Sequence, residues 1–124
     1  MITTMGKSIH VAKRYIVEFG NTAALDDRTE AFIGVLESLG CSVYKYGTEE
    51  DATAGGFETP ECDYKDAIDN LKAFIKDPSI FEDRGSIKKT IADCGETPES
   101  LLAIMQNYLH EADTRNGYLH FLDF

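Results

Sequence analysis

Three short stretches have apolar residues on one or both faces of a period-two pattern, which predicts β-strands. They cover residues 13–19, 41–46 and 118–124. All three are rich in β-branched and aromatic residues, and the first is closed by Gly20 and Asn21, which are typical strand terminators. We expect the first stretch to carry much of the core, with one buried face and one partly solvated face.

The last stretch is apolar on both of its faces. A strand of this kind is either central in its sheet or pressed against a second copy of the chain, and both arrangements stay open. The second arrangement predicts a homodimer through the C-terminal strand. Its contact residues would be Tyr118, Leu119, Phe121, Leu122 and Phe124.

Apolar positions three to four residues apart predict helices over residues 27–39, 63–77 and 98–112. A shorter helix is expected to start at Ser86 and to stop at Gly95.

Capping residues support two of these boundaries. Asp27, with Glu30 three residues on, has the spacing of a capping box, and Gly40 would end that helix. Thr97 precedes Pro98, and proline is favoured at the first position of a helix.

Together these elements predict one domain of the α/β or α+β class, with a sheet of about three or four strands covered by about four helices. Strand, helix and strand follow one another over residues 13–46. This would be a right-handed crossover if the strands are parallel, and an antiparallel arrangement through an intervening strand is the alternative. Residues 1–8 are expected to be frayed, and residues 48–62 to form a long acidic surface loop.

The composition is that of a globular domain, with 43% hydrophobic and 27% charged residues in a chain of 124. No apolar run has the length of a membrane span or of a signal peptide, so a cytoplasmic protein is expected. Cys41, Cys62 and Cys94 have neither a paired spacing nor zinc-site spacing, so we expect reduced thiols and a fold that needs no disulfide, metal or cofactor.

The formal charge of −10 argues against nucleic acid and against an anionic membrane as partners. Residues 1–46 carry five basic and five acidic side chains, so the whole excess follows Tyr46. Between residues 49 and 69 the only basic side chain is Lys65, and the local charge is −7. The eight carboxylates of this stretch are Glu49, Glu50, Asp51, Glu58, Glu61, Asp63, Asp66 and Asp69.

This acidic stretch has three candidate roles. It can be a solvated face that keeps the protein soluble, or a docking surface for a basic protein. A calcium loop starting at Glu50 is discounted, because its third and fifth positions are Ala52 and Ala54, which have no side-chain oxygen. We therefore predict no metal site.

Residues 86–111 have the rhythm of a helix-turn-helix, but the second helix offers Glu99 where a DNA reader needs basic or amide side chains, so a packing role is favoured. Catalytic signatures are weak, because the histidines do not show metal-site spacing and no glycine-rich phosphate loop follows a strand. An enzyme is therefore the less favoured class. A catalytic set, if one exists, would pair Cys94 or Cys62 with His110 or His120.

Two function hypotheses follow. The leading one is a non-enzymatic cytosolic binding protein, similar in type to an immunity protein or inhibitor, whose acidic surface engages a basic protein partner. The alternative is a small-ligand-binding or enzymatic domain with a pocket under residues 48–62, lined by Tyr15, Tyr44 or Tyr46.

Overall fold

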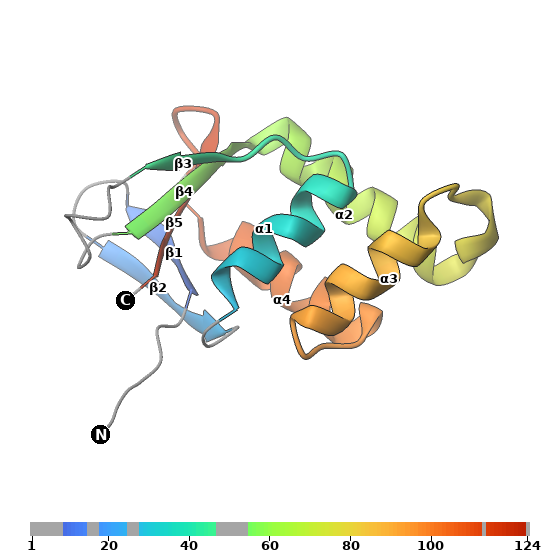
Figure 1. Cartoon of the computed structure of the whole chain (residues 1–124). Helices are drawn as coiled ribbons and strands as arrows, with labels where there is room; N and C mark the ends of the chain where they lie inside the picture. Colours follow the sequence, from blue (N-terminus) through green and yellow to red (C-terminus); the bar gives the residue numbers. More distant parts are fainter. Residues whose placement is uncertain (1–8, 15–17, 25–27, 47–54, 113, 124) are drawn as a thin grey trace, which may run out of the picture.

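The computed structural model describes residues 9–14, 18–24, 28–46, 55–112 and 114–123 (Figure 1). The strands are β1 (Ile9–Arg14), β2 (Glu18–Ala24), β3 (Tyr44–Tyr46), β4 (Gly55–Pro60) and β5 (Tyr118–Asp123). The helices are α1 (Thr29–Ser38), α2 (Glu61–Lys76), the 3-10 turn η1 (Pro78–Ile80), α3 (Arg84–Asp93) and α4 (Pro98–Glu111).

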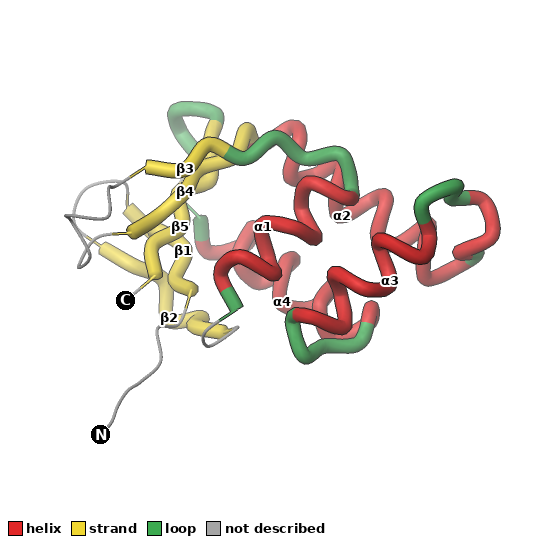
Figure 2. The backbone as a smooth tube through the Cα atoms, viewed as in Figure 1, coloured by secondary structure: helices red, strands yellow, loops and turns green. Residues whose placement is uncertain are grey.

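All strands belong to one antiparallel sheet with the order β2-β1-β5-β4-β3. Figure 2 shows the strands gathered at one end of the molecule and the helices at the other. The class is therefore α+β, one of the two predicted classes. The described sheet has five strands, one more than the predicted three to four.

The predicted N-terminal strand is divided between two strands. Residues 13–14 end β1, and residues 18–19 begin β2, with Arg14 paired to Glu18 and Ile9 paired to Ala24. The segment between them, residues 15–17, lies outside the described residues. The reversal escaped prediction because the stretch contains no glycine, proline, asparagine or aspartate, the usual signals of a turn. Gly20 and Asn21, expected to close the strand, lie within β2.

The strand–helix–strand unit is not a crossover between neighbouring strands. β2 and β3 lie at opposite edges of the sheet, with β1, β5 and β4 between them. Because each neighbouring pair is antiparallel, β2 and β3 run in the same direction, and the chain crosses the sheet from one edge to the other through α1. The intervening strands come partly from the far end of the chain, so local sequence could not reveal this order.

The predicted loop over residues 48–62 contains a strand and a helix start. Residues 55–60 form β4, and α2 begins at Glu61. Gly55, Gly56 and Pro60 favoured a loop, but Pro60 is the last residue of β4, where its missing N–H is tolerated. The second predicted strand is also shorter than expected, because only its last three residues form β3.

The predicted helices are confirmed, with shifted ends. α1 begins after Arg28, which makes no side-chain cap, and the predicted cap Asp27 lies outside the described residues. α3 follows Asp83, so Ser86 is inside the helix and does not cap it. The N-terminus of α4 matches its prediction, because Thr97 accepts a hydrogen bond from the N–H of Ser100 in a capping box.

A cluster of five buried aromatic side chains joins the sheet to three helices. Phe121 on β5 is its centre, and its ring centroid lies 4.8 Å from Phe57, 5.4 Å from Tyr108, 5.8 Å from Tyr64 and 5.9 Å from Phe32. All five are at most 2% exposed. The hydroxyl groups of Tyr64 and Tyr108 donate to main-chain carbonyls, which satisfies the polar ends of these rings in the core.

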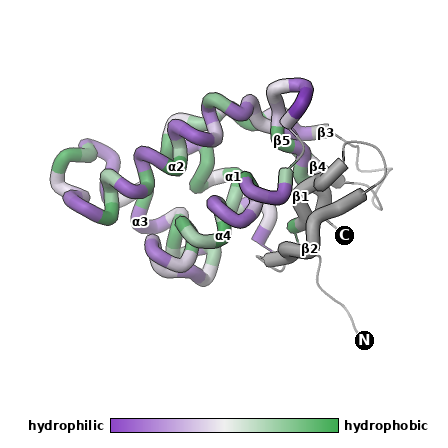
Figure 3. The backbone as a smooth tube through the Cα atoms, turned by 180° about the vertical axis from the view of Figure 1, so that it is seen from behind, coloured by the Kyte–Doolittle hydropathy of each residue, from purple (hydrophilic) through white to green (hydrophobic). Residues whose placement is uncertain are grey.

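The α3–α4 pair takes part in this packing. Leu101, Met105 and Tyr108 of α4 are fully buried, and Ile87 and Ile91 of α3 are at most 2% exposed. Figure 3 shows hydrophobic and hydrophilic residues alternating along each helix, as expected for helices with one buried face.

Candidate functional site

Only part of the acidic stretch falls within the described residues. Glu49, Glu50 and Asp51 lie outside the described residues, and the described carboxylates are divided between β4 and α2. Three of those five carboxylates are engaged in contacts within the fold.

Glu58 is bound to a buried histidine. It pairs with His120 across β4 and β5, and its Oε2 lies 3.1 Å from His120 Nδ1. The other ring nitrogen of His120, Nε2, lies 3.1 Å from Nδ2 and 3.4 Å from Oδ1 of Asn116. His120 is only 4% exposed. Because neighbouring Phe57 and Thr59 face the core, alternation along β4 places Glu58 on the opposite side of the sheet. This carboxylate therefore has a structural contact of its own.

Two further carboxylates are used at the start of α2. Glu61 Oε2 lies 3.3 Å from Lys65 Nζ, one helical turn away. Asp63 accepts a hydrogen bond of 3.2 Å from the main-chain N–H of Ser42, and so ties α2 to the segment that follows α1.

Asp66 and Asp69 are both exposed. The buried residues of α2, among them Tyr64, Ala67 and Leu71, define the opposite side of the helix. The two aspartates therefore point outward, and they are the described part of the predicted docking surface that remains open to a partner.

The C-terminal strand is the central strand of the sheet. β5 lies between β1 and β4, and Phe121 pairs with both Val11 and Phe57. The first of the two predicted arrangements is thus the observed one. Leu119 and Phe121 are fully buried and Tyr118 is partly buried, whereas Phe124 lies outside the described residues. The structure gives no support to a homodimer through this strand, because both of its main-chain edges are already paired, one with β1 and the other with β4.

The two buried thiols, Cys41 and Cys94, lack the surroundings of an activated nucleophile. Burial raises the pKa of Cys41 to about 11 and that of Cys94 to about 11, the opposite of the lowering that catalysis needs. Cys62 is exposed. Hydrogen bonds join His120 to Glu58 and Asn116, and His110 is exposed on α4, so the cysteine–histidine set stays a prediction.

The pocket predicted under residues 48–62 falls largely outside the described part of the chain. Tyr15 and residues 48–54 are outside the described residues, and Tyr44 is 52% exposed on the edge strand β3. Pattern reasoning missed a cleft elsewhere, which lies between α2, α3 and the start of α4.

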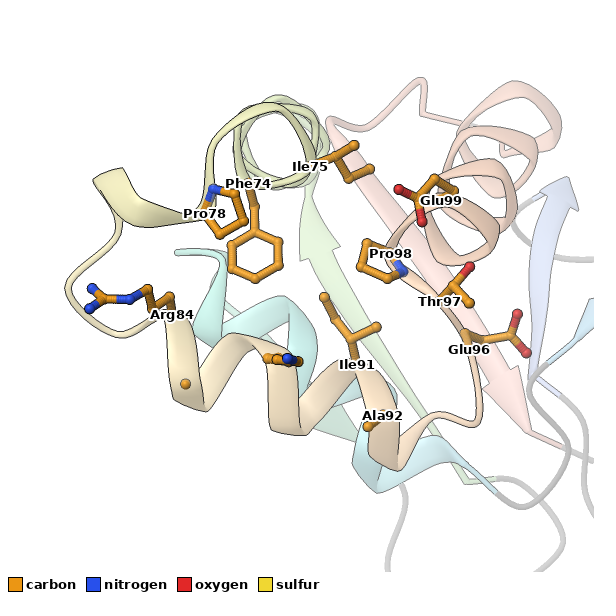
Figure 4. A pocket seen from close by; sticks show the side chains of 12 residues that line it. Phe74, Ile75, Pro78, Arg84, Ile91, Ala92, Glu96, Thr97, Pro98 and Glu99 are labelled. Atoms are coloured by element: carbon orange, nitrogen blue, oxygen red, sulfur yellow. The ribbon is translucent and has the colours of Figure 1, made fainter.

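This cleft, which we call the α2–α3–α4 cleft, has a volume of about 680 Å³. Figure 4 shows Phe74, Ile91 and Pro98 directed toward a common space from the three helices. Arg84 and Lys88 of α3 lie on one rim, and Glu96 and Glu99 lie near the start of α4 on the other; these residues line the cleft together with Ile75, Pro78, Gly85, Ala92 and Thr97. A cleft of this size with an apolar floor and a few charged groups is typical of small-molecule sites.

Within the described residues there is no group of three or more histidine, cysteine, aspartate or glutamate side chains that could hold a metal ion. The helices of the described ranges are also too short or too polar to cross a bilayer. Comparisons of the chain with protein-family models, with curated proteins and with solved structures find no match.

Proposed function

We propose that this protein is a non-enzymatic binding protein that engages a basic protein partner through an acidic surface centred on Asp66 and Asp69. The observation that carries the proposal is the outward placement of these two carboxylates on α2 in a chain of charge −10. Like charges on one helix face destabilise the helix slightly, and a cationic partner would remove that repulsion.

The proposal narrows the eight-residue surface predicted from sequence. Glu58, Glu61 and Asp63 already have partners within the fold, so they are less available to a partner protein. Glu49, Glu50 and Asp51 belong to the proposed surface by their charge alone. An immunity or inhibitor role is the form of this function that we favour, because carboxylates can occupy phosphate positions in the basic site of a nuclease.

The proposal includes a cytoplasmic location. Cys41, Cys62 and Cys94 are free thiols, and free thiols are maintained in a reducing compartment.

The experiment compares two charge-matched variants. Asp66→Lys/Asp69→Lys changes the proposed surface, and Glu82→Lys/Asp83→Lys makes the same charge change at exposed residues before α3. A partner captured on the immobilised wild-type chain is identified, and its association kinetics with each chain are measured from about 0.1 to 1 M salt, over which the Debye length falls from about 10 Å to about 3 Å.

We expect the first variant to lower the association rate by about tenfold or more, and the control to stay within about threefold of wild type. The wild-type rate should fall as salt rises. Equal rates for both variants at every salt concentration would show that the carboxylates serve solubility alone. A parallel variant, Glu49→Lys/Glu50→Lys/Asp51→Lys, tests the contribution of these three carboxylates.

A further inference from the structure

We propose that the α2–α3–α4 cleft binds a small amphipathic carboxylate, of the class of medium-chain fatty acids, as a free monomer. The site is separate from Asp66 and Asp69, neither of which lines it, so this proposal and the proposed function stand or fall independently.

The floor of the cleft provides the apolar half of the complementarity. Phe74 and Ile91 are 4% and 2% exposed, so they belong to the core while still lining the cleft. On α3, Gly85 and Ala92 keep the wall low, and a Cβ added at Gly85 would meet no other atom within 4 Å. The lining residues of α3 run from position 84 to 92, which at 1.5 Å per residue is about 12 Å, a length suited to a medium-length alkyl chain.

The charged side chains at the two rims of the cleft determine which charge the head group of the ligand should carry. Both ionisable side chains on the α3 rim are cationic, and the first turn of α3 contains no acidic residue. Lys88 is exposed and makes none of the ion pairs found in the described residues, whereas its neighbour Lys89 is bound to Asp93 at 2.9 Å.

The two carboxylates of the opposite rim, Glu96 and Glu99, repel an anionic ligand less strongly than two free carboxylates would. Glu96 accepts a hydrogen bond of 2.8 Å from Ser100 Oγ, and Figure 4 shows it directed away from the apolar floor. Glu99 stands in the first turn of α4, where the positive end of the helix dipole offsets part of its charge. Arg84 donates a hydrogen bond of 3.1 Å to the carbonyl of Phe81 and points away from the apolar floor in Figure 4. A carboxylate head is therefore best placed beside Lys88, with its tail over Ile91 and toward Pro98.

The test uses the full chain and three probes that share one alkyl chain: decanoate, decanol and decyltrimethylammonium, each below its micelle-forming concentration. Binding is followed by isothermal titration calorimetry and by amide chemical-shift changes. Lys88→Glu is the site variant, and Lys89→Glu is the matched control with the same charge change one residue away. Thermal melting checks the fold of each chain, and Lys88→Gln replaces Lys88→Glu if the latter melts early.

We expect saturable decanoate binding, with shift changes at Phe74, Ile91 and Ala92. Lys88→Glu should weaken it by about tenfold or more, Lys89→Glu by less than about threefold, and decanol should bind several-fold more weakly than decanoate. Equal affinities for decanoate and decanol, or equal effects of the two lysine variants, would overturn the anion assignment. Tighter binding of decyltrimethylammonium would show that Glu96 and Glu99 set the preference instead, and the lack of saturable binding by any probe would remove the site.

Discussion

Replacing Phe121 with alanine should cost more stability than almost any other single change in the chain. Phe121 is fully buried on the central strand and contacts four other rings with centroid distances from 4.8 to 5.9 Å. Truncation of a buried phenylalanine costs about 3–5 kcal/mol, and the upper half of that range applies where neighbours from four elements cannot close the cavity together. A domain of this size has a total stability of roughly 6–19 kcal/mol, so the variant should remain folded with a clearly reduced stability.

The assay is urea unfolding followed by far-ultraviolet circular dichroism. We expect the midpoint of Phe121→Ala to fall at nearly unchanged m-value, and the melting temperature to drop by about 10–20 °C. Ile80→Ala is the matched control, because Ile80 is a large apolar side chain that is 64% exposed, and its effect should stay within about 0.5 kcal/mol. A loss below about 1.5 kcal/mol for Phe121→Ala would refute the idea that this ring organises the core.

Four further outcomes are expected. With a thiol reagent at pH 8, Cys62 should react promptly and Cys41 and Cys94 only on unfolding, and three fast thiols would contradict the buried environments. Because the folded chain holds the protons of both buried thiols up to a pKa of about 11, against an ordinary value of 9.0, stability measured by urea unfolding should fall as pH rises from about 9 to 11. Thr97→Ala should destabilise by about 1 kcal/mol in the same assay, and Thr97→Ser should recover most of it. Glu58→Ala should cost about 1–3 kcal/mol, because the buried imidazole loses its carboxylate, whereas equal stability to wild type would mean that the imidazole finds another partner.

The helices were predictable because their signals are local. A residue's burial in a helix recurs every three to four positions, and a cap such as Thr97 acts on a main-chain group within the same turn. α2, α3 and α4 were therefore found close to their observed positions. The α1 start was harder, since Arg28 offers no side-chain cap in the described structure.

The sheet was predictable in kind but not in order. Alternation along a strand reports which face is buried, and it carries no information on which strand lies alongside. β5 pairs with β1 from the other end of the chain, and β4 begins with two glycines that locally favour a loop. Two apolar faces on residues 118–124 did indicate a central strand, although the same pattern was compatible with a subunit contact.

The summed charge of residues 49–69 does not indicate which carboxylates are available to a partner. A count over residues 49–69 treats each carboxylate alike, yet Glu58 lies beside a buried imidazole, Asp63 holds a main-chain N–H, and Asp66 faces outward. Position along β4 and α2 decides which of these carboxylates can meet a partner, and those positions depend on the pairing of β4 with β5 and on the packing of α2 against α4. Likewise the cations of the α2–α3–α4 cleft are a minority in an acidic chain, so a net charge of −10 hides them. The anion preference proposed for this cleft depends on the fold, which brings Lys88 of α3 near Phe74 of α2.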